Sequence, residues 1–257
     1  MPLLKIDEVT KVYEGKVTHR ALNQLSFEVE KGEFLAVMGP SGSGKTTLLN
    51  LISTIDSLTA GEILIDGISP HRLDKNELAL FRRRKLGFIF QDFNLLQMLT
   101  VEENLVLPLT LDYVPVNDMA TRVLELAKRL DLTSILHKRP NEISGGEAQR
   151  TAIGRALIHK PAIILADEPT GNLDSKASKD VLDLLSRVSA NEGATIVMVT
   201  HDPIAASYCD RVLFIKDGEF FNEIYGDERR QTFYQRILNV LSLLGGNVND
   251  LSATRLP

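Results

Sequence analysis

The first third of the chain consists of short apolar segments bounded by glycine. Alternating or continuous apolar positions occupy residues 3–13 (LLKIDEVTKVY), 25–39 (LSFEVEKGEFLAVMG) and 61–67 (GEILIDG), which predicts strands. The second segment ends in a glycine-rich loop. After Lys45, apolar residues follow at helical spacing at Leu48, Leu49 and Ile52. We therefore expect a strand, a glycine loop and a helix in immediate succession.

The middle of the chain, from about residue 69 to residue 143, is predicted to be mainly helical. Its clearest helix carries an apolar face made of Val123, Leu124, Leu126, Ala127 and Leu130. We interpret this part as a helical subdomain, at about residues 92–158, inserted into an α/β core.

Strands and helices alternate in the last part of the chain. Residues 162–167 (AIILAD) and 194–200 (ATIVMVT) are predicted as buried strands around a helix at about residues 178–188, and 211–220 (RVLFIKDGEF) as a β pair. This alternation implies a largely parallel sheet. The predicted fold is therefore α/β over residues 1–226, with a mainly parallel central sheet, an N-terminal antiparallel β subdomain and the helical insertion. Residues 227–257 are predicted to form an appended helical tail.

Composition narrows the class of protein. A chain of 257 residues with 44% hydrophobic and 25% charged residues suits one large folded domain or two smaller ones. The net charge of −5 argues against a nucleic-acid partner, which favours basic surfaces. The lone Cys209 cannot form an internal disulfide and fits a reducing compartment. No apolar stretch approaches a membrane span, and the first residues are too charged for a signal peptide, so we expect a cytosolic chain unless a partner recruits it.

Residues 39–46, GPSGSGKT, match the phosphate-binding pattern G-x-x-x-x-G-K-[ST]. Glycines let backbone N–H groups turn toward the phosphates of a nucleotide, and the following helix adds its positive N-terminus. Lys45 is expected to reach the β- and γ-phosphates, Thr46 to ligate Mg²⁺ and Thr47 to bind the α-phosphate. A chance match is disfavoured because strand and helix flank the loop. The residues predicted to hold ATP here are Gly39, Pro40, Ser41, Gly42, Ser43, Gly44, Lys45, Thr46 and Thr47.

A carboxylate pair follows the apolar strand at residues 162–166. Asp167 is expected at the carboxyl edge of the sheet, where it can hold Mg²⁺ directly or through water. Glu168 is placed to polarise the water that attacks the γ-phosphate. The alternative, an ordinary surface Asp-Glu pair, is weakened by the apolar residues that precede it.

Residues 143–150, ISGGEAQR, resemble the signature motif of the ATP-binding-cassette (ABC) ATPases. Physically, Ser144, Gly145 and Gly146 form a second anion-binding loop at a helix N-terminus. Ile143 and Glu147 depart from the leucine and glutamine that the wider family most often has. Neither removes the Ser-Gly-Gly amides, so activity is expected to survive.

The resemblance implies roles for further residues. Gln91 resembles the glutamine that senses Mg²⁺ and the attacking water and links them to a transport partner. His201 looks like the histidine that contacts the γ-phosphate and orients Glu168. Asp174 ends a loop, residues 171–174, that looks like the one crossing a dimer interface. Tyr13 looks like the aromatic on which adenine stacks, although it also fits an ordinary tyrosine at a strand end.

The same resemblance implies partners. In the family, two copies pack head to tail so that each ATP lies between one copy's phosphate loop and the other's Ser144. A separate multi-span membrane permease is expected to use the closing and parting of the two copies. This places the chain at the cytoplasmic face of the membrane. Its docking surface is expected within residues 94–109, although those leucines also suit the core of the helical subdomain. The basic run at residues 82–85 is interpreted as a solvated helix end rather than a lipid or nucleic-acid site.

Within the family, residues 166–174 (ADEPTGNLD) look like the branch of lipoprotein-release, macrolide-export and cell-division ATPases. Residues 88–96, 201–203 and 230–233 look most like ATPases of bacitracin-type peptide-antibiotic transporters. The expected function is ATP hydrolysis that powers export or removal of a peptide antibiotic or a related compound. The alternative is an ATPase that regulates a membrane assembly, as in cell division, without transport. A chromosome or DNA-repair ATPase would need long coiled-coil arms, and no heptad run of that length exists here.

Overall fold

The computed structural model describes residues 2–15, 17–226 and 229–245. The chain forms two compact units, Met1–His71 with Met198–Pro257, called unit 1, and Arg72–Val197, called unit 2.

An antiparallel sheet opens unit 1. Its strand order is β2-β1-β4, with β1 at Leu4–Tyr13, β2 at His19–Val29 and β4 at Ala60–Ile65. The central strand β1 pairs antiparallel with both neighbours. Leu4, Ile6 and Val9 of β1 are buried, as the apolar pattern predicts. The N-terminal antiparallel β subdomain is confirmed.

The remaining strands of unit 1 carry the glycine loop. β3 (Phe34–Met38) is buried along its whole length and pairs parallel with β8 (Arg211–Lys216), which pairs antiparallel with β9 (Glu219–Tyr225). The helix α1 (Lys45–Ile52) follows the loop after β3, and the short α7 (Pro203–Ala206) precedes β8. The predicted succession of strand, loop and helix is therefore present.

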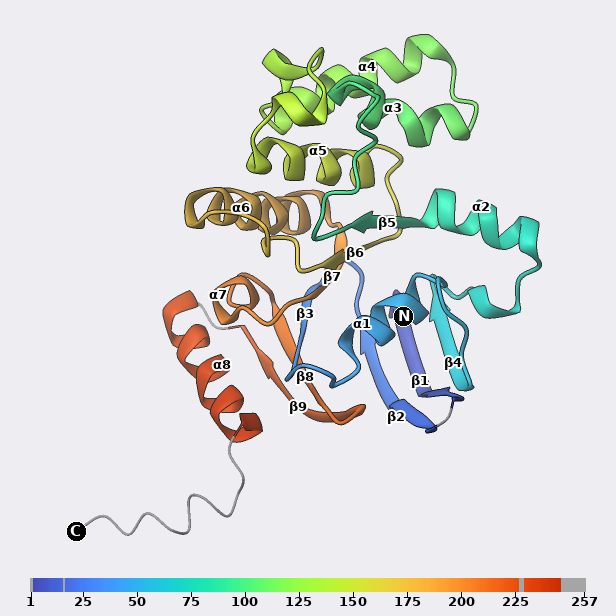
Figure 1. The fold of residues 1–257 in the computed structure, drawn as a ribbon, viewed down its shortest axis with the longest axis vertical. Coiled ribbons are helices and arrows are strands. Elements are labelled where there is room, and N and C mark those ends of the chain that lie inside the picture. Colours follow the sequence, from blue (N-terminus) through green and yellow to red (C-terminus); the bar gives the residue numbers. More distant parts are fainter. Residues whose placement is uncertain (1, 16, 227–228, 246–257) are drawn as a thin grey trace. The chain divides into compact units, whose positions relative to one another are not determined.

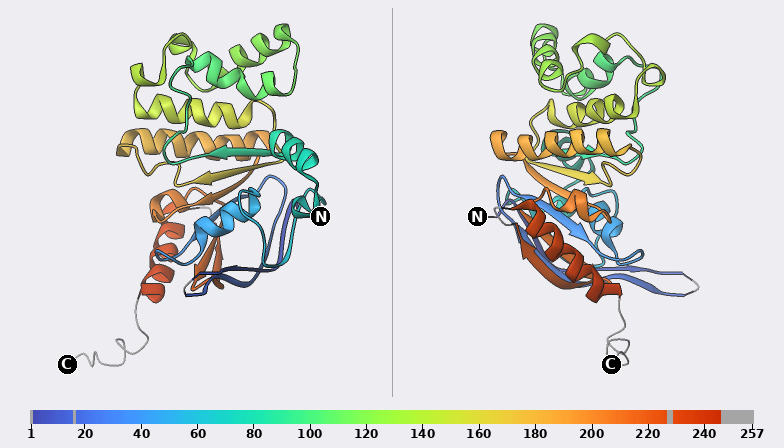
Figure 2. Two further views of the ribbon diagram at one scale, coloured as in Figure 1. Left: turned by 45° about the vertical axis from the view of Figure 1, so that its right-hand side comes forward. Right: turned by 90° about the vertical axis from the view of Figure 1, so that its left-hand side faces the viewer.

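The segment predicted as a helical tail contains α8 (Arg230–Gly245). Its buried residues Phe233, Ile237 and Val240 form one face, and α8 packs against α7 and β9. Figure 2 shows α8, in red, running along β9. The predicted polar end, residues 246–257, lies outside the described residues, and the bounds 227–257 stay a prediction.

Unit 2 combines two parallel strands with helices. β5 (Leu86–Ile89) pairs parallel with β6 (Ile163–Asp167). Its helices are α2 (Lys75–Lys85), α3 (Val101–Leu111), α4 (Val116–Arg129), α5 (Gly145–Leu157) and α6 (Ser175–Glu192). α3 packs on both α4 and α5, and α5 packs on α6 (Figure 1). The bounds 92–158 for the helical subdomain stay a prediction.

The apolar face predicted for α4 is correct except at one position. Val123, Leu126, Ala127 and Leu130 are buried, whereas Leu124 is 47% exposed. Successive helical residues are rotated by about 100°, so Leu124 falls outside the stripe that its neighbour Val123 shares with the others.

The larger sheet has the strand order β5-β6-β7-β3-β8-β9, with β7 at Thr195–Val199. The α/β fold class with a mainly parallel sheet is confirmed. None of the helices in the described residues combines the length and apolar character that a membrane crossing requires.

Candidate functional site

The glycine loop of unit 1 lies against the backbone of neighbouring strands. Gly44 has φ +100°, and a Cβ there would overlap the carbonyl oxygen of Ala21 and lie 2.7 Å from Leu22 Cδ2. A Cβ on Gly39 would overlap the carbonyl oxygen of Ile215. The loop can follow this path only because both residues lack a side chain.

The N-terminus of α1, which follows this loop, has no side-chain hydrogen bond to cap it. By contrast, a side chain accepts backbone N–H bonds at the start of α2, α3, α5 and α6. α4 also lacks such a cap, but it begins after Pro115 rather than after a glycine loop. The first-turn amides of α1 carry partial positive charge and suit an external anion.

Ser43 supplies a second polar group at this loop. Its side-chain oxygen Oγ is buried and has no hydrogen-bond partner within the described part of the chain. A buried hydroxyl without a partner costs free energy, and such groups mark places where another acceptor or donor binds. Together, the glycine cradle, the uncapped helix and Ser43 fit the phosphates of a nucleotide.

Lys45 and Thr47 extend from the first turn of α1. Lys45 Nζ donates hydrogen bonds to the carbonyl oxygens of Gly39, at 2.9 Å, and Pro40, at 3.0 Å. Its ammonium group therefore lies over the loop. Thr46 is exposed and Thr47 half-buried.

Tyr13 lies at the end of β1 and is linked to this loop. The residue is 39% exposed, and its hydroxyl donates to Asp56 Oδ2 at 2.8 Å. Burial and the bond to Asp56 raise the pKa of Tyr13, while a hydrogen bond with Thr47 opposes that rise. Tyr13 is therefore fixed beside α1. Asp56 and Lys11, which also contacts the ring, were missed by the sequence analysis.

His201 follows β7 and is exposed. The backbone N–H of Thr200 donates to the carbonyl oxygen of Val37, at 3.2 Å. The segments that lead to His201 and to Gly39 therefore run side by side within unit 1. This is the sheet edge where ligands of such folds collect.

In unit 2, Asp167 is the last residue of β6 and Glu168 begins the turn that follows. Glu168 has φ +43°, and its carbonyl oxygen accepts a hydrogen bond from the N–H of Gly171 at 3.0 Å. A left-handed conformation at a non-glycine residue stores strain and is concentrated at functional sites.

Gln149 of α5 supports this turn. Its side chain is fully buried, and Nε2 donates to the carbonyl oxygen of Pro169 at 2.6 Å. The residue next to Glu168 is thus tied to α5, the helix that carries most of the signature-like motif. Sequence reasoning missed Gln149, although a polar residue on the apolar side of α5 was a usable signal.

Gln91 lies beside Asn172. Asn172 Nδ2 donates to the backbone oxygen of Gln91 at 3.2 Å and to Asp92 Oδ1 at 2.7 Å, while Gln91 Nε2 donates to Asn172 Oδ1 at 3.4 Å. A Cβ on Gly171 would lie 3.0 Å from Gln91 Nε2. The loop at residues 171–174 therefore holds Gln91. Asp174 ends that loop as the N-cap of α6, accepting from the amides of Lys176 and Ala177.

Ser144 is the N-cap of α5. Its hydroxyl oxygen accepts from the N–H of Glu147 at 3.3 Å, and Glu147 Oε2 accepts from the N–H and hydroxyl of Ser144 at 2.7 and 2.8 Å. The glutamate that departs from the family pattern thus completes a capping box. Hydrogen bonds from Ser144 lower the pKa of Glu147.

Gly145 and Gly146 bring α5 close to the next elements of unit 2. A Cβ on Gly145 would lie 3.3 Å from Leu173 Cδ2, and one on Gly146 would lie 3.1 Å from Ala177 Cβ. Both glycines therefore have a packing role in addition to any role in binding an anion.

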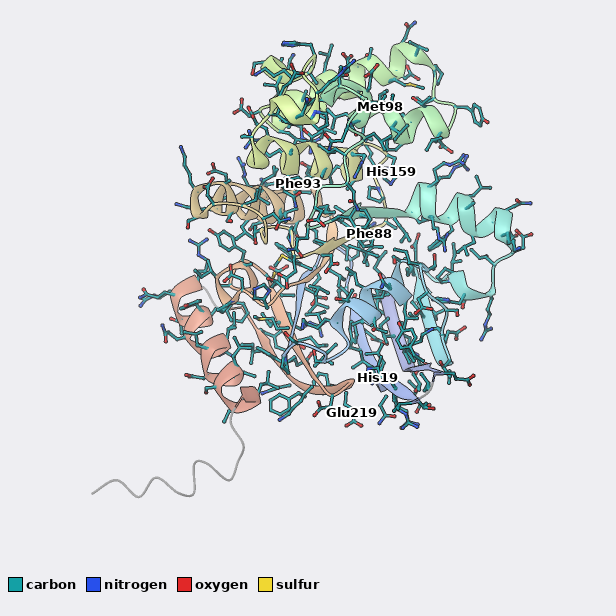
Figure 3. All side chains as sticks on the ribbon, in the orientation of Figure 1. His19, Phe88, Phe93, Met98, His159 and Glu219 are labelled. Carbon is teal, nitrogen blue, oxygen red and sulfur yellow. The ribbon has the colours of Figure 1, made fainter. Side chains whose placement is uncertain are left out.

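Several apolar residues at positions 94–109 belong to the core. Leu95 packs with Ala148 and Ala152, and Phe93 lies against this cluster beside α5 (Figure 3). Arg155 of α5 holds the same segment by donating to the carbonyl oxygens of Asn94 and Phe93. The buried residues Val101, Leu105 and Leu109 support the core interpretation, but Leu96 and Met98 are exposed, Met98 by 86%.

The predicted site residues fall in both units. Tyr13, residues 39–47 and His201 belong to unit 1. Gln91, residues 144–146, Asp167, Glu168 and Asp174 belong to unit 2. Among the described residues, no group of three or more His, Cys, Asp or Glu side chains could hold a metal ion by itself.

Comparison with known proteins identifies the family. A family model described as "ABC transporter" matches residues 22–171. The chain belongs to the ABC transporter family. The predicted resemblance is confirmed, and the chain is an ATP-binding and ATP-hydrolysing subunit of that family.

Several ABC proteins are similar along the whole chain. The "ABC transporter ATP-binding protein YxdL" of Bacillus subtilis is 59% identical over 254 residues, which cover 99% of this chain and 99% of that protein. The "Bacitracin export ATP-binding protein BceA" of Halalkalibacterium halodurans is 50% identical over 252 residues, covering 97% of this chain and 100% of that protein.

A solved ABC structure is also similar. The ATP-binding cassette MJ0796, described as a dimeric structure of a post-hydrolysis state bound to ADP and Pi, has a TM-score of 0.80 and 42% identity. The match covers 88% of this chain and 100% of that one.

Proposed function

We propose that ATP binds to unit 1 with its phosphates on residues 39–47 and its adenine against Tyr13. The observation that carries this proposal is the uncapped N-terminus of α1 behind a glycine cradle that admits no Cβ. Lys45 would neutralise the β- and γ-phosphates, and Ser43 and Thr47 would donate hydroxyl hydrogen bonds to phosphate oxygens.

Thr46, Gln91 and Asp167 are proposed to hold Mg²⁺ together with the phosphates. A hydroxyl, an amide and one carboxylate are all oxygen donors, the set that Mg²⁺ prefers when substrate phosphates and water complete its shell. Bound Mg²⁺ would supply positive charge to the β- and γ-phosphate oxygens.

Glu168 is proposed to polarise the attacking water, with His201 and Gln91 orienting the γ-phosphate and that water. Support comes from the strained backbone of Glu168 and from the bond between Gln149 and Pro169, which holds the turn in place. The bonds between Asn172 and Gln91 likewise restrict the glutamine.

A second copy is proposed to complete each site head to tail, with Ser144, Gly145 and Gly146 facing the γ-phosphate and Asp174 at the interface. Two observations support this. The three residues form a helix N-terminus, which suits an anion, and the similar cassette MJ0796 is described as dimeric.

The motion of this dimer is proposed to drive a separate multi-span permease that exports or removes a peptide antibiotic. The 50% identity to the bacitracin export protein BceA supports this choice. The chain would then lie at the cytoplasmic face of the membrane. Its net charge of −5 gives no reason to propose a nucleic-acid partner.

The hydrolytic assignment is tested by comparing two Glu→Gln variants. Glu168→Gln should bind ATP with near wild-type affinity and hydrolyse it at least about a hundredfold more slowly, because general bases contribute about 10²–10⁴ in rate. Glu125→Gln, on the exposed side of α4, is the matched control and should keep the wild-type rate. Wild-type turnover by Glu168→Gln would remove Glu168 from the role of base.

A further inference from the structure

The ring of Tyr13 in unit 1 is held at its edge and on one face. At the edge, its hydroxyl donates to Asp56 Oδ2 at 2.8 Å. On the face, the ammonium nitrogen of Lys11 lies 4.7 Å from the ring centroid. A cation at this distance is attracted to the ring and restricts its tilt.

Lys11 is itself fixed. Its side chain is only 9% exposed, and Nζ donates to Asp56 Oδ1 at 2.6 Å and to the carbonyl oxygen of Ser57 at 2.8 Å. Lysine is rarely buried without a charged partner. The two carboxylate oxygens of Asp56 therefore accept from different side chains: Oδ1 from Lys11 and Oδ2 from Tyr13.

Asp56 is also attached to the helix that follows the phosphate loop. Its backbone N–H donates to the carbonyl oxygen of Asn50 in α1, at 3.2 Å. The aromatic ring and the phosphate loop are thus anchored to one short helix.

We propose that Lys11 and Asp56 are positioning residues that hold the Tyr13 ring at a fixed place relative to the phosphate loop, so that the purine base of ATP can stack on it. This inference rests on the proposed placement of adenine at Tyr13. A ring fixed before binding loses less freedom when the base arrives, which raises affinity for the whole nucleotide. Lys11 and Asp56 contact Tyr13, Asn50 and Ser57 rather than residues 39–47, so the binding of the phosphates alone should not depend on them.

The competing view is that the ion pair only stabilises the end of β1. The two alternatives can be distinguished by comparing the affinities of a ligand that has a purine base and a ligand that has only phosphates. ATP tests the ring and the phosphate loop together, whereas inorganic tripolyphosphate tests the phosphate loop alone. Calorimetric titration of the purified full chain with each ligand, in the presence of Mg²⁺, gives the two affinities.

Lys11→Met and Asp56→Asn should each weaken ATP binding about three- to tenfold, the range expected for loss of an ordered aromatic contact, and change tripolyphosphate binding by less than about twofold. Tyr13→Phe, which keeps the ring but loses the bond to Asp56, should fall in the same range. In hydrolysis assays the KM for ATP should rise while kcat stays near wild type.

Lys5→Met is the matched control. Lys5 lies on the same strand and pairs with Asp7 at 3.0 Å, but both side chains are well exposed. This variant should bind both ligands like wild type. Thermal unfolding of every variant shows whether it is folded.

Four results would overturn the proposal. Equal losses for ATP and tripolyphosphate would mean that the pair only supports the loop, and unchanged affinity for both would mean that the ring needs no support. A wild-type chain that binds tripolyphosphate but gains nothing from the base would reject the placement of adenine at Tyr13. A wild-type chain that binds neither ligand would reject the phosphate site itself, and with it this inference.

Discussion

At the residue scale, two positions of the phosphate loop require glycine, and the reasons differ. Gly44 and Gly42 both have positive φ, +100° and +79°. A Cβ on Gly44 would collide with the backbone of β2, whereas a Cβ on Gly42 would meet nothing within 4 Å. Conformational strain is therefore common to both positions, and collision is specific to Gly44.

Alanine substitution separates these two effects. Gly42→Ala should cost about 1 kcal/mol of stability through strain alone and leave ATP binding measurable. Gly44→Ala should cost clearly more, at least about 2 kcal/mol, and abolish binding because the loop must move. Denaturant unfolding measures the stability of each variant, and ATP titration measures its binding. Similar results for the two variants would contradict the close approach of the loop to β2.

Sequence patterns found the residues of this site that lie in contiguous motifs, such as residues 39–46 and Asp167. They did not find contacts between distant positions. Tyr13 and Asp56 are 43 positions apart, and Gln91 and Asn172 are 81 apart. Such pairs depend on the path of a loop, which tertiary packing sets and no local spacing encodes.

At the element scale, α2, α3, α5 and α6 begin at a side-chain cap, whereas α1 and α4 begin without one. The start of α5 is capped by Ser144 and Glu147, and hydrogen bonds from Ser144 lower the pKa of Glu147. Because the pKa in the folded state lies below the unfolded value of 4.5, the stabilisation is complete above pH 4.5 and is lost as the pH falls through the lower folded value.

Glu147→Gln should therefore lower stability near neutral pH by a few tenths to about 1 kcal/mol, the usual range for capping interactions on a partly exposed helix end. The difference from wild type should shrink once the pH drops below the folded pKa of Glu147. Urea unfolding of both proteins at several pH values measures this difference in the free energy of unfolding. A difference that persists unchanged in acid would show that the charge of Glu147 is not the cause.

Gln149 gives a second prediction at this scale, because it connects α5 to the turn that carries Glu168. Gln149→Ala should cost about 1–3 kcal/mol by leaving the carbonyl oxygen of Pro169 without its buried partner. It should also lower kcat more than it raises KM. The exposed Gln97→Ala is the control and should change neither. Unchanged kcat in a folded Gln149→Ala protein would show that α5 does not position Glu168.

Apolar periodicity predicted which elements exist better than where they end. The helix expected at about residues 178–188 runs from Ser175 to Glu192. Its additional turns are polar, and its limits are set by the Asp174 cap and by Gly193 in the left-handed conformation. Periodicity detects the apolar stripe of a helix, so it misses turns that add no large apolar side chain to that stripe.

At the scale of the whole molecule, an ABC subunit must pass the energy of hydrolysis to another chain. Leu96 and Met98 are large exposed apolar residues just after the segment that carries Gln91. Burial of their neighbours restricts the proposed docking surface to these two side chains and their surroundings. Few of the leucines in residues 94–109 are therefore available to a partner.

Met98→Asp should keep wild-type ATP hydrolysis by the isolated chain but lose association with the permease, because a charge would be buried at the contact. Tyr113→Asp is the control, since Tyr113 is 90% exposed elsewhere in unit 2. Co-purification from membranes with a tagged permease measures the effect. Equal association of both variants would place the docking surface elsewhere.

We expect the phosphate loop of one copy and the Ser144 loop of another to enclose the same ATP. The most direct test is the mass of Glu168→Gln in solution, measured by size-exclusion chromatography with light scattering. With saturating Mg²⁺-ATP the mass should be that of two chains, and with ADP, or after the further change Lys45→Ala, that of one. A single-chain mass at saturating ATP would show that the two loops do not enclose one ATP.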